Sequence, residues 1–210
     1  MSKGKNVLVA GATGTTGKII VDLLKNSTEY EPIAMVRKEK QQKEFESQNV
    51  KTILGDLEKD LSHTTQNAHK VIFAAGSGGK NVIGVDQEGA KKLTDAAKNS
   101  GASKFVMLSS MGADDPSVSE DLQEYLQAKQ NADEHLRSSG INYTIVRPGS
   151  LTNKDASGKI KLKEKFSEMG EISRADVART LIAVLEDDVR SNQTFEILSG
   201  DTEINNAVKA

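Results

Sequence analysis

The sequence contains no cysteine and no tryptophan, and only 4% of its 210 residues are aromatic. Without cysteine the chain can form no disulfide, hold no metal through a thiolate and use no thiol as a nucleophile. The scarcity of aromatic side chains argues against binding of single-stranded nucleic acid, which depends on base stacking. Basic and acidic residues nearly balance, 28 against 30. No excess charge therefore favours nucleic acid or an anionic membrane as a partner.

Long hydrophobic runs are also absent. No stretch approaches the roughly 18 apolar residues that a membrane-spanning helix needs, and residues 1–6 are polar with no apolar signal region. The histidines are scattered and lack the spacing of metal ligands: His63, His69 and His135. We therefore expect a cytoplasmic protein with no metal site.

The sequence does contain a glycine-rich turn near its start. The β-prone residues 7–10 lead into Gly11, and Gly14 and Gly17 follow before apolar residues at helical spacing. This order predicts a strand, a tight turn and a helix. Gly11 can adopt the backbone angles of the turn, Gly14 leaves room for a pyrophosphate, and Gly17 lets the helix pack closely.

The start of that helix is suited to phosphate, because its first amides have no internal partner and lie at the positive end of the helix dipole. The alternative is an ordinary glycine-rich turn without a ligand. Three glycines at intervals of three residues, between a strand and a helix, favour a dinucleotide instead. The predicted contacts in the turn are Gly11, Thr13, Gly14, Thr15, Thr16 and Gly17.

Short apolar strands then alternate with helical segments along the chain. Further strands are predicted at residues 33–36, 50–54, 71–75, 105–108, 143–146 and 195–198. Helices are predicted at residues 39–48, 85–100 and 116–139, with another beginning at Ser173; Ser117 and Glu120 match a capping box for the third. This alternation predicts an α/β fold, a doubly wound parallel sheet of Rossmann type in a single domain over residues 1–210.

One segment interrupts the alternation. Residues 150–170 are polar and rich in lysine, with no pattern except at Ile160-Lys161-Leu162. They follow the sixth strand, at the edge of the sheet where ligands bind in such folds. We predict a small substrate-side loop that is mobile without ligand and closes over the substrate as a lid.

Several short motifs follow one another along the chain, at the ends of predicted strands or in the helices after them: Gly11-x-x-Gly14-x-x-Gly17, Asp56-Leu57, Ala74-Ala75-Gly76, Asp86-x-x-Gly89, Ser109-Ser110, Tyr125-x-x-x-Lys129, Arg147-Pro148-Gly149 and Ser173 to Ala178. In this order the chain resembles the short-chain dehydrogenase/reductase superfamily over nearly its whole length. The resemblance is to the compact atypical branch that contains NmrA-like proteins, biliverdin and flavin reductases and small proteins labelled as sugar epimerases. Each motif alone is weak, but together they indicate a Rossmann-type fold and a nicotinamide cofactor.

The resemblance points to Tyr125, Lys129 and Ser110 as catalytic residues. Tyr125 and Lys129 are four residues apart on one predicted helix and so share a face. An ammonium beside a phenol favours the phenolate, and such a tyrosine can give a proton to a carbonyl or take one from an alcohol. By resemblance, Lys129 also bonds the nicotinamide ribose and Ser110 donates to the substrate oxygen.

The end of the second strand bears on which cofactor binds. Arg37 and Lys38 stand where an acidic residue would bind a ribose 2′-hydroxyl and a basic one would accept a 2′-phosphate. We therefore predict NADP, with NAD less favoured. The other predicted cofactor contacts are Asp56, Leu57, Ala74, Ala75, Gly76, Lys129, Pro148, Gly149 and Leu151.

These residues predict an NADP-dependent oxidoreductase that transfers a hydride between the nicotinamide and a small carbonyl or alcohol substrate. Two alternatives stay open. One is a non-catalytic NADP(H) sensor of NmrA-like type that docks a protein partner, and the other is an epimerase of a small sugar. Asp86 stands where many relatives place an asparagine that supports the proton relay, and a carboxylate accepts hydrogen bonds without donating them.

Overall fold

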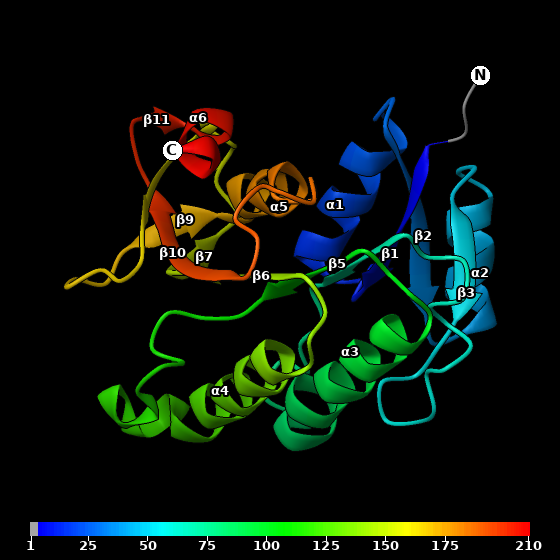
Figure 1. Cartoon of the computed structure of the whole chain (residues 1–210), viewed down its shortest axis with the longest axis horizontal. Helices are drawn as coiled ribbons and strands as arrows, with labels where there is room; N and C mark the ends of the chain where they lie inside the picture. The colour runs from blue at the N-terminus through cyan, green and yellow to red at the C-terminus, as the bar shows by residue number, and fades with distance from the viewer. Residues whose placement is uncertain (1–3) are drawn as a thin grey trace.

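A nine-stranded sheet forms the centre of the computed structural model, which describes residues 4–210 (Figure 1). Residues 1–3, the start of the polar segment noted above, lie outside the described residues. The strands of the sheet, in chain order, are β1 (Lys5–Ala10), β2 (Tyr30–Val36), β3 (Lys51–Leu54), β4 (Lys70–Phe73), β5 (Lys104–Leu108), β6 (Tyr143–Pro148), β8 (Lys159–Lys163), β10 (Gln193–Ser199) and β11 (Thr202–Glu203). Two short strands, β7 (Ser150–Thr152) and β9 (Glu171–Ser173), pair separately.

The strand order is that of a doubly wound sheet. From one edge to the other it runs β3-β2-β1-β4-β5-β6-β10-β8-β11. All pairs from β3 to β10 are parallel, whereas β8 pairs antiparallel with both β10 and β11. The order reverses between β1 and β4, and crevices at such a reversal bind ligands. The predicted α/β class and Rossmann-type sheet are confirmed, with an antiparallel edge added.

Helices cover both faces of this sheet. In Figure 1, α3 (Ala90–Asn99) and α4 (Gln123–Ser138) lie on one side, and α1 (Thr15–Lys25), α5 (Arg174–Ala183) and α6 (Ile204–Lys209) lie on the other. Helix α2 (Glu39–Glu46) packs beside β2 and β3. A π-helix, η1 (Val82–Gly89), leads directly into α3, and two short 3₁₀ helices, η2 (Pro116–Val118) and η3 (Glu120–Leu122), precede α4.

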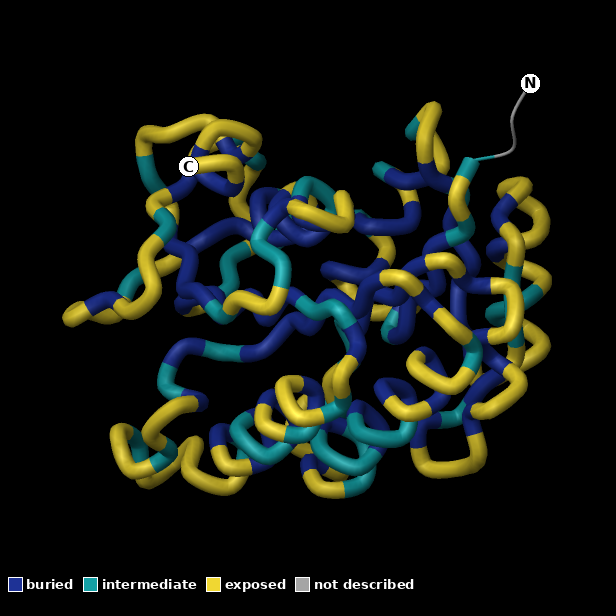
Figure 2. The backbone as a smooth tube through the Cα atoms, viewed as in Figure 1, coloured by how far each residue is buried: buried dark blue, intermediate teal, exposed yellow. Residues whose placement is uncertain are grey.

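Strand β1 shows why the sheet is buried from both sides. Residues 7–10 are all 0% exposed. Val7 and Val9 belong to a core shared with α1 and α5, while Leu8 and Ala10 belong to a second core shared with α3 and α4. Since neighbouring residues of a strand point to opposite faces, a strand between two helical layers must be apolar throughout. Figure 2 shows this buried centre in dark blue beneath the exposed outer surfaces of the helices.

The starts of two predicted helices differ in the structure. The helix predicted over residues 116–139 begins only at Gln123, because η2 and η3 occupy the preceding residues. The capping box predicted for Ser117 and Glu120 is wrong: the Asp115 side chain instead accepts a hydrogen bond from the backbone N–H of Ser117 and caps η2. The helix predicted from residue 85 begins three residues earlier, as η1.

Residues 150–170 are not irregular as predicted, because they contain β7 and β8. Strand β8 extends the main sheet, with Leu162 opposite Ile197 of β10. Ile160 is fully buried and the flanking Lys159 and Lys161 are exposed. The alternation of lysine with apolar residues is thus the period of a one-sided strand. Whether the remaining residues close over a ligand stays a prediction. Within residues 4–210, no helix is both long and apolar enough to cross a membrane.

Candidate functional site

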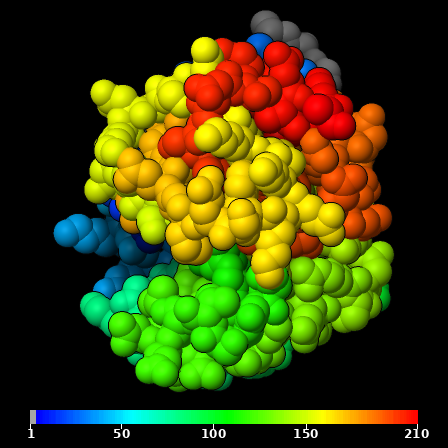
Figure 3. Space-filling view, turned by 90° about the vertical axis from the view of Figure 1, so that its left-hand side faces the viewer, coloured from blue at the N-terminus to red at the C-terminus, as the bar shows by residue number. Residues whose placement is uncertain are grey.

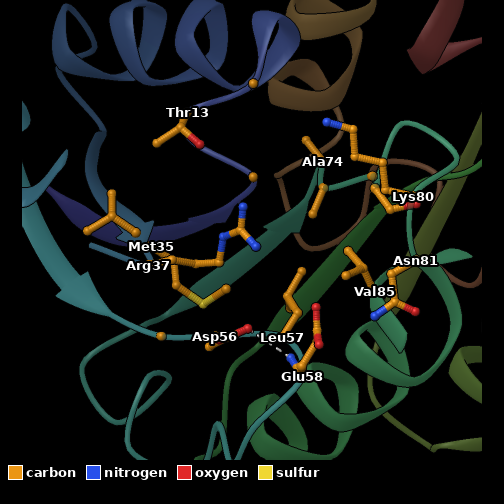
Figure 4. A pocket seen from close by; sticks show the side chains of 17 residues that line it. Thr13, Met35, Arg37, Asp56, Leu57, Glu58, Ala74, Lys80, Asn81 and Val85 are labelled. Atoms are coloured by element: carbon orange, nitrogen blue, oxygen red, sulfur yellow. Dashed lines mark hydrogen bonds between the residues drawn. The ribbon is translucent and has the colours of Figure 1, made fainter. Parts of the chain in front are cut away.

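A cavity of about 290 Å³ lies at the carboxyl ends of β1, β2, β3 and β4 (Figure 4). It therefore occupies the position where the strand order reverses. The wall includes these predicted cofactor residues: Gly11, Thr13, Gly14, Arg37, Asp56, Leu57, Ala74, Ala75 and Gly76. Residues from four separate strand ends thus converge on one space, as the predicted topology requires.

The three glycines of the turn differ in how much space a side chain would have. Gly11 has φ +85°, and a Cβ there would lie 2.6 Å from the backbone of Ala74. A Cβ on Gly17 would lie 2.0 Å from the carbonyl oxygen of Gly11, so only glycine allows α1 to pack against the turn. A Cβ on Gly14 would approach only that same oxygen, at 3.3 Å. Gly14 therefore presents open space to the cavity, which is what a nearby pyrophosphate needs.

The start of α1 adds hydrogen-bond donors beside that space. Gly14 is the N-cap residue, and among the described residues no side chain caps the helix. The first-turn N–H groups are thus available to an anion, in keeping with their position at the positive end of the helix. Thr13 and Thr15 are exposed here, whereas the side chain of Thr16 is turned inward and buried. The residues present therefore fit a dinucleotide phosphate.

Arg37 and Lys38 are separated by the structure. The Arg37 side chain lies in the wall of the cavity, and in Figure 4 its guanidinium points toward the middle of the pocket. Lys38 is the N-cap residue of α2 and is not part of that wall. The backbone N–H groups of both residues donate to the Gln41 side chain, each at 3.1 Å, which holds the end of β2 in place. Only Arg37 is therefore positioned to contact a ligand in the cavity.

The sequence interpretation missed part of the wall. Four missed residues come from the loop after β4 and from η1, namely Ser77, Lys80, Asn81 and Val85, and four from elsewhere, namely Met35, Val36, Gly55 and Glu58. The loop has a visible signal in Gly78 and Gly79, which both adopt positive φ. Asp56, which was predicted, also accepts the backbone N–H of Glu58 at 3.1 Å, so it stabilises its own turn.

Tyr125 and Lys129 meet on α4, as their spacing predicts. The Lys129 ammonium lies 5.5 Å from the centre of the Tyr125 ring and 5.8 Å from that of Phe73. Lys129 is only 3% exposed. Its nearest charge is Asp86 of η1, whose Oδ1 is 3.3 Å from Nζ. The buried ammonium therefore stands between an aromatic phenol and a carboxylate that largely balances its charge.

The two serines after β5 have different surroundings. Ser109 is buried, and its hydroxyl donates to the Asp133 carboxylate at 2.9 Å. Ser110 is half-buried, and its hydroxyl donates to the carbonyl oxygen of Met111 at 3.1 Å. Ser109 is thus committed to the interior, whereas Ser110 keeps partial access to solvent. Ser110 as a donor to substrate stays a prediction.

Arg147 joins α4 to the end of β6. Its guanidinium donates twice to Oδ2 of Asp133, at 3.1 and 2.9 Å, and lies 3.6 Å from Asp114. Burial raises the pKa of the Asp133 carboxyl above its ordinary value, although Arg147 and the Ser109 hydroxyl act against that shift. Asp133 follows Lys129 by one turn of α4. The buried pair of Asp133 and Arg147 therefore holds in place the helix that carries Tyr125.

The remaining predicted residues lie beyond the cavity wall. Pro148 and Gly149 are buried at the end of β6, and Leu151 is half-buried in β7. A Cβ on Gly149 would lie 2.3 Å from the carbonyl oxygen of Gly170, so glycine permits the close approach of the segment after β8. These residues stand near the end of the sheet that carries Ser110. Their contact with a nicotinamide stays a prediction.

Known proteins are similar to this chain in sequence and in fold. A model of the NAD(P)H-binding family matches residues 11–188. The chain is 36% identical over 211 residues to an uncharacterized sugar epimerase, YhfK of Bacillus subtilis, across 97% of this chain and 98% of that protein. A solved structure from Bacillus halodurans, proposed to be an NAD-dependent epimerase/dehydratase, has a TM-score of 0.93 and 38% identity, covering 98% and 99% of the two chains. The oxidoreductase ylbE of Lactococcus lactis has a TM-score of 0.86 and 28% identity, covering 97% and 95%.

Proposed function

The chain belongs to the NAD(P)H-binding family, and from that premise we propose that it is an NADP-dependent oxidoreductase acting on a small carbonyl or alcohol substrate. Membership confirms the resemblance to short-chain dehydrogenases/reductases. The observation that carries the proposal further is the cavity, whose wall contains Gly14, Arg37 and Gly76. A Cβ on Gly76 would lie 3.2 Å from Oδ1 of Asp86, the carboxylate that pairs with the buried Lys129.

Arg37 supports the choice of NADP. Its guanidinium projects into the cavity from the end of β2, where the adenine ribose lies in Rossmann-type sites. Arginine makes paired, charge-assisted hydrogen bonds to phosphate. The pyrophosphate would rest against Gly14 and the free N–H groups of α1, and the 2′-phosphate would meet Arg37.

Three side chains of this protein would support proton transfer to the substrate. The bound cofactor supplies a hydride to the carbonyl carbon when it is NADPH. Tyr125 would give its phenolic proton to the carbonyl oxygen, Ser110 would donate a hydrogen bond to that oxygen, and Lys129 would hold the cofactor and orient Tyr125. In the opposite direction Tyr125 would take the proton of an alcohol. The aromatic contact between Lys129 and Tyr125 supports this pairing.

Epimerisation of a small sugar is a second candidate, and the names of the two Bacillus relatives favour it. Because those relatives match this chain over 98% and 99% of their own length, a larger substrate domain does not separate them from it. The same tyrosine would serve, but the hydride would return to the substrate. A reductase therefore consumes NADPH continuously, whereas an epimerase does not.

The proposal is tested by following NADPH oxidation with a panel of aldehydes, ketones, quinones and flavins. A reductase oxidises NADPH in proportion to at least one acceptor and prefers it to NADH. Tight binding of NADPH with no turnover of any acceptor contradicts the catalytic proposal and supports the NADP(H) sensor that docks a protein partner. Sugar interconversion without net NADPH loss supports the epimerase.

A further inference from the structure

A second cavity, of about 390 Å³, lies between α1, α5, α6 and the turn that precedes β8. In Figure 1 these three helices are on the side of the sheet opposite α3 and α4. The wall of the second cavity shares no described residue with the wall of the cofactor cavity. Cavities of this size commonly hold small molecules, with an apolar wall and a few polar groups that orient the ligand. Both kinds of group are present in the second cavity.

One part of this wall is apolar. Leu23 of α1 and both Ile182 and Ala183 of α5 are half-buried and pack against the main core. Ile204, at the start of α6, is buried beside them. Covering half-buried apolar side chains removes more of their surface from water, which is favourable. The wall is therefore suited to an apolar group of a ligand.

Two groups of opposite charge border the same cavity. A Cβ on Gly158 would lie 3.8 Å from Nη1 of Arg179 and 3.8 Å from Oε2 of Glu203. Because both atoms lie at that distance from one point, they cannot be further apart than twice that distance. Within residues 4–210, Arg179 and Glu203 nevertheless form no ion pair with each other. A short ligand with two charges can therefore contact both groups at once.

The hydrogen-bonding capacity of these two groups is largely unused. In the described part of the chain, the Arg179 guanidinium has no hydrogen-bond or ion-pair partner. The Glu203 carboxylate has one ion-pair partner, the Lys159 ammonium, which lies 3.8 Å from Oε1 and leaves Oε2 free. Gly158 has φ +73° and no side chain, so it leaves the approach to both groups open. A free guanidinium and a free carboxylate oxygen therefore stand beside an apolar wall.

We propose that this cavity binds a free α-amino acid with a large apolar side chain. The α-carboxylate accepts hydrogen bonds from the Arg179 guanidinium, and the α-ammonium donates to Oε2 of Glu203. The side chain of the ligand lies against Leu23 and Ile182. Arginine suits the first contact, because its N–H groups form paired, charge-assisted hydrogen bonds with a carboxylate.

The arrangement of charges disfavours simpler ligands. Glu203 repels a molecule that carries only a carboxylate, and Arg179 repels one that carries only an amine. An amino acid with a small side chain gains both charged contacts but leaves the apolar wall uncovered. The inference concerns a different cavity from the one in the proposed function and does not depend on that function.

Calorimetric titration of the full chain with L-leucine and L-phenylalanine tests the site. At least one of them should bind, and three comparison molecules should bind roughly tenfold more weakly or not at all. Glycine lacks the apolar side chain, 4-methylpentanoate lacks the ammonium of leucine, and L-leucinamide lacks its carboxylate.

Three variants locate the binding. Arg179→Gln and Glu203→Gln should each weaken binding of the favoured amino acid by roughly ten- to a hundredfold, as for the loss of a hydrogen bond to a charged group. Both side chains are exposed, so both variants should fold. Arg137→Gln is the matched control and should leave amino-acid affinity unchanged, because Arg137 is an exposed arginine of α4, on the other side of the sheet. All three variants should bind NADPH within about twofold of the unaltered protein, since none of these residues lines the cofactor cavity.

Several results would overturn the proposal. One is the absence of binding of both amino acids at millimolar concentration. Another is equal affinity for 4-methylpentanoate or L-leucinamide, because the missing charge then plays no part. Unchanged affinity in Arg179→Gln and Glu203→Gln, or an equal loss in Arg137→Gln, would also overturn it. Failure of the unaltered protein to bind NADPH contradicts the proposed function alone and leaves this site in place.

Discussion

Among single residues, two glycines of the turn have different predicted roles: Gly14 is needed for dinucleotide binding and Gly17 for folding. Gly14→Val adds a side chain in open space, near only the Gly11 carbonyl oxygen, so the variant should fold. It should lose dinucleotide binding, because the valine occupies the place of the pyrophosphate. Gly17→Val puts a Cβ 2.0 Å from that same oxygen and should destabilise the protein. Circular dichroism and NADPH titration of both variants measure this; a folded Gly14→Val that binds NADPH normally would place the phosphates elsewhere.

A substitution at Arg37 tests the predicted preference for NADPH over NADH. Arg37→Ala should lower NADPH affinity by about 1.5–3 kcal/mol, as for a hydrogen bond to a charged group, and leave NADH affinity nearly unchanged. Lys38→Ala is the control, because Lys38 caps α2 and is not part of the cavity wall. Calorimetric titration of both cofactors provides the measurement. Equal affinity of the unaltered protein for NADPH and NADH would contradict the predicted preference.

Lys104 gives the protein a pH dependence far from the cavity. It is fully buried beside Lys70 in the neighbouring strand, and its ammonium donates to the carbonyl oxygens of Glu186 and Val189 at 2.7 and 2.6 Å. Burial, followed by the charge of Lys70, lowers the pKa of Lys104 to about 8.

Between pH 8 and the ordinary value near 10.5, Lys104 therefore holds a proton only in the unfolded chain, so stability rises with pH there. We expect a gain of about 2 kcal/mol between pH 7.5 and 9.5 from this group. Above pH 10 the gain is opposed, because burial raises the pKa of Tyr30 to about 12. Urea unfolding across this range measures the rise, and Lys104→Met should flatten it. An equally steep rise in Lys104→Met would assign it to another group.

At the scale of elements, residues 150–170 divide into a fixed and an exposed part. Strand β8 is held in the sheet by β10, whereas residues 164–170 are mostly exposed, with Met169 70% exposed. Figure 3 shows this yellow segment lying over the green segment that leads into α4. Lys165 pairs with Asp114 across the two, and the Phe166 N–H donates to the Glu196 side chain at 2.6 Å.

We therefore expect a lid, if one forms, within residues 164–170. Amide hydrogen exchange there should slow when NADPH and a substrate bind, because closure shields the backbone. The turn at residues 186–192, at the opposite end of the sheet, serves as the internal control. Equal exchange in residues 164–170 with and without ligand would remove the support for a lid.

Sequence patterns predict the start of one helix correctly, misplace the start of another and miss one strand. Ser173 was predicted to begin a helix, and its hydroxyl accepts the N–H of Asp176 at 3.0 Å at the start of α5. The start of α4 was misplaced because Asp115, not Ser117, supplies the local cap. Strand β8 was missed because five residues of alternating lysine and apolar character are too short to distinguish from a solvated loop, and its partner β10 lies 30 residues further on.

At the scale of the whole molecule, alternation along the chain determines the topology, and the topology brings distant motifs to one cavity. Nine predicted cofactor residues line it because the carboxyl ends of parallel strands share one edge of the sheet. Lys80, Asn81 and Val85 were not predicted, because the sequence does not reveal the folding of the loop after β4 or the π-helix η1. Side chains that depend on such local geometry become visible only in the structure.

As a whole, we propose, the molecule places Tyr125 to give a proton to the carbonyl oxygen of a substrate while the cofactor is bound. Tyr125→Phe keeps the ring beside Lys129 and removes the transferable proton. A flavin can take its proton from solvent, so flavin reduction can persist in the variant, and the decisive substrates are the accepted aldehydes and ketones.

The most direct test is steady-state NADPH-dependent reduction of those carbonyl substrates by the unaltered protein and by Tyr125→Phe, with NADPH affinity measured in parallel. We predict that turnover falls by roughly 10²–10⁴-fold, as for loss of a general acid, while NADPH affinity stays within about twofold, because the glycine turn, Arg37 and Lys129 remain. Full activity of Tyr125→Phe on every accepted aldehyde and ketone would contradict the role of Tyr125 as proton donor.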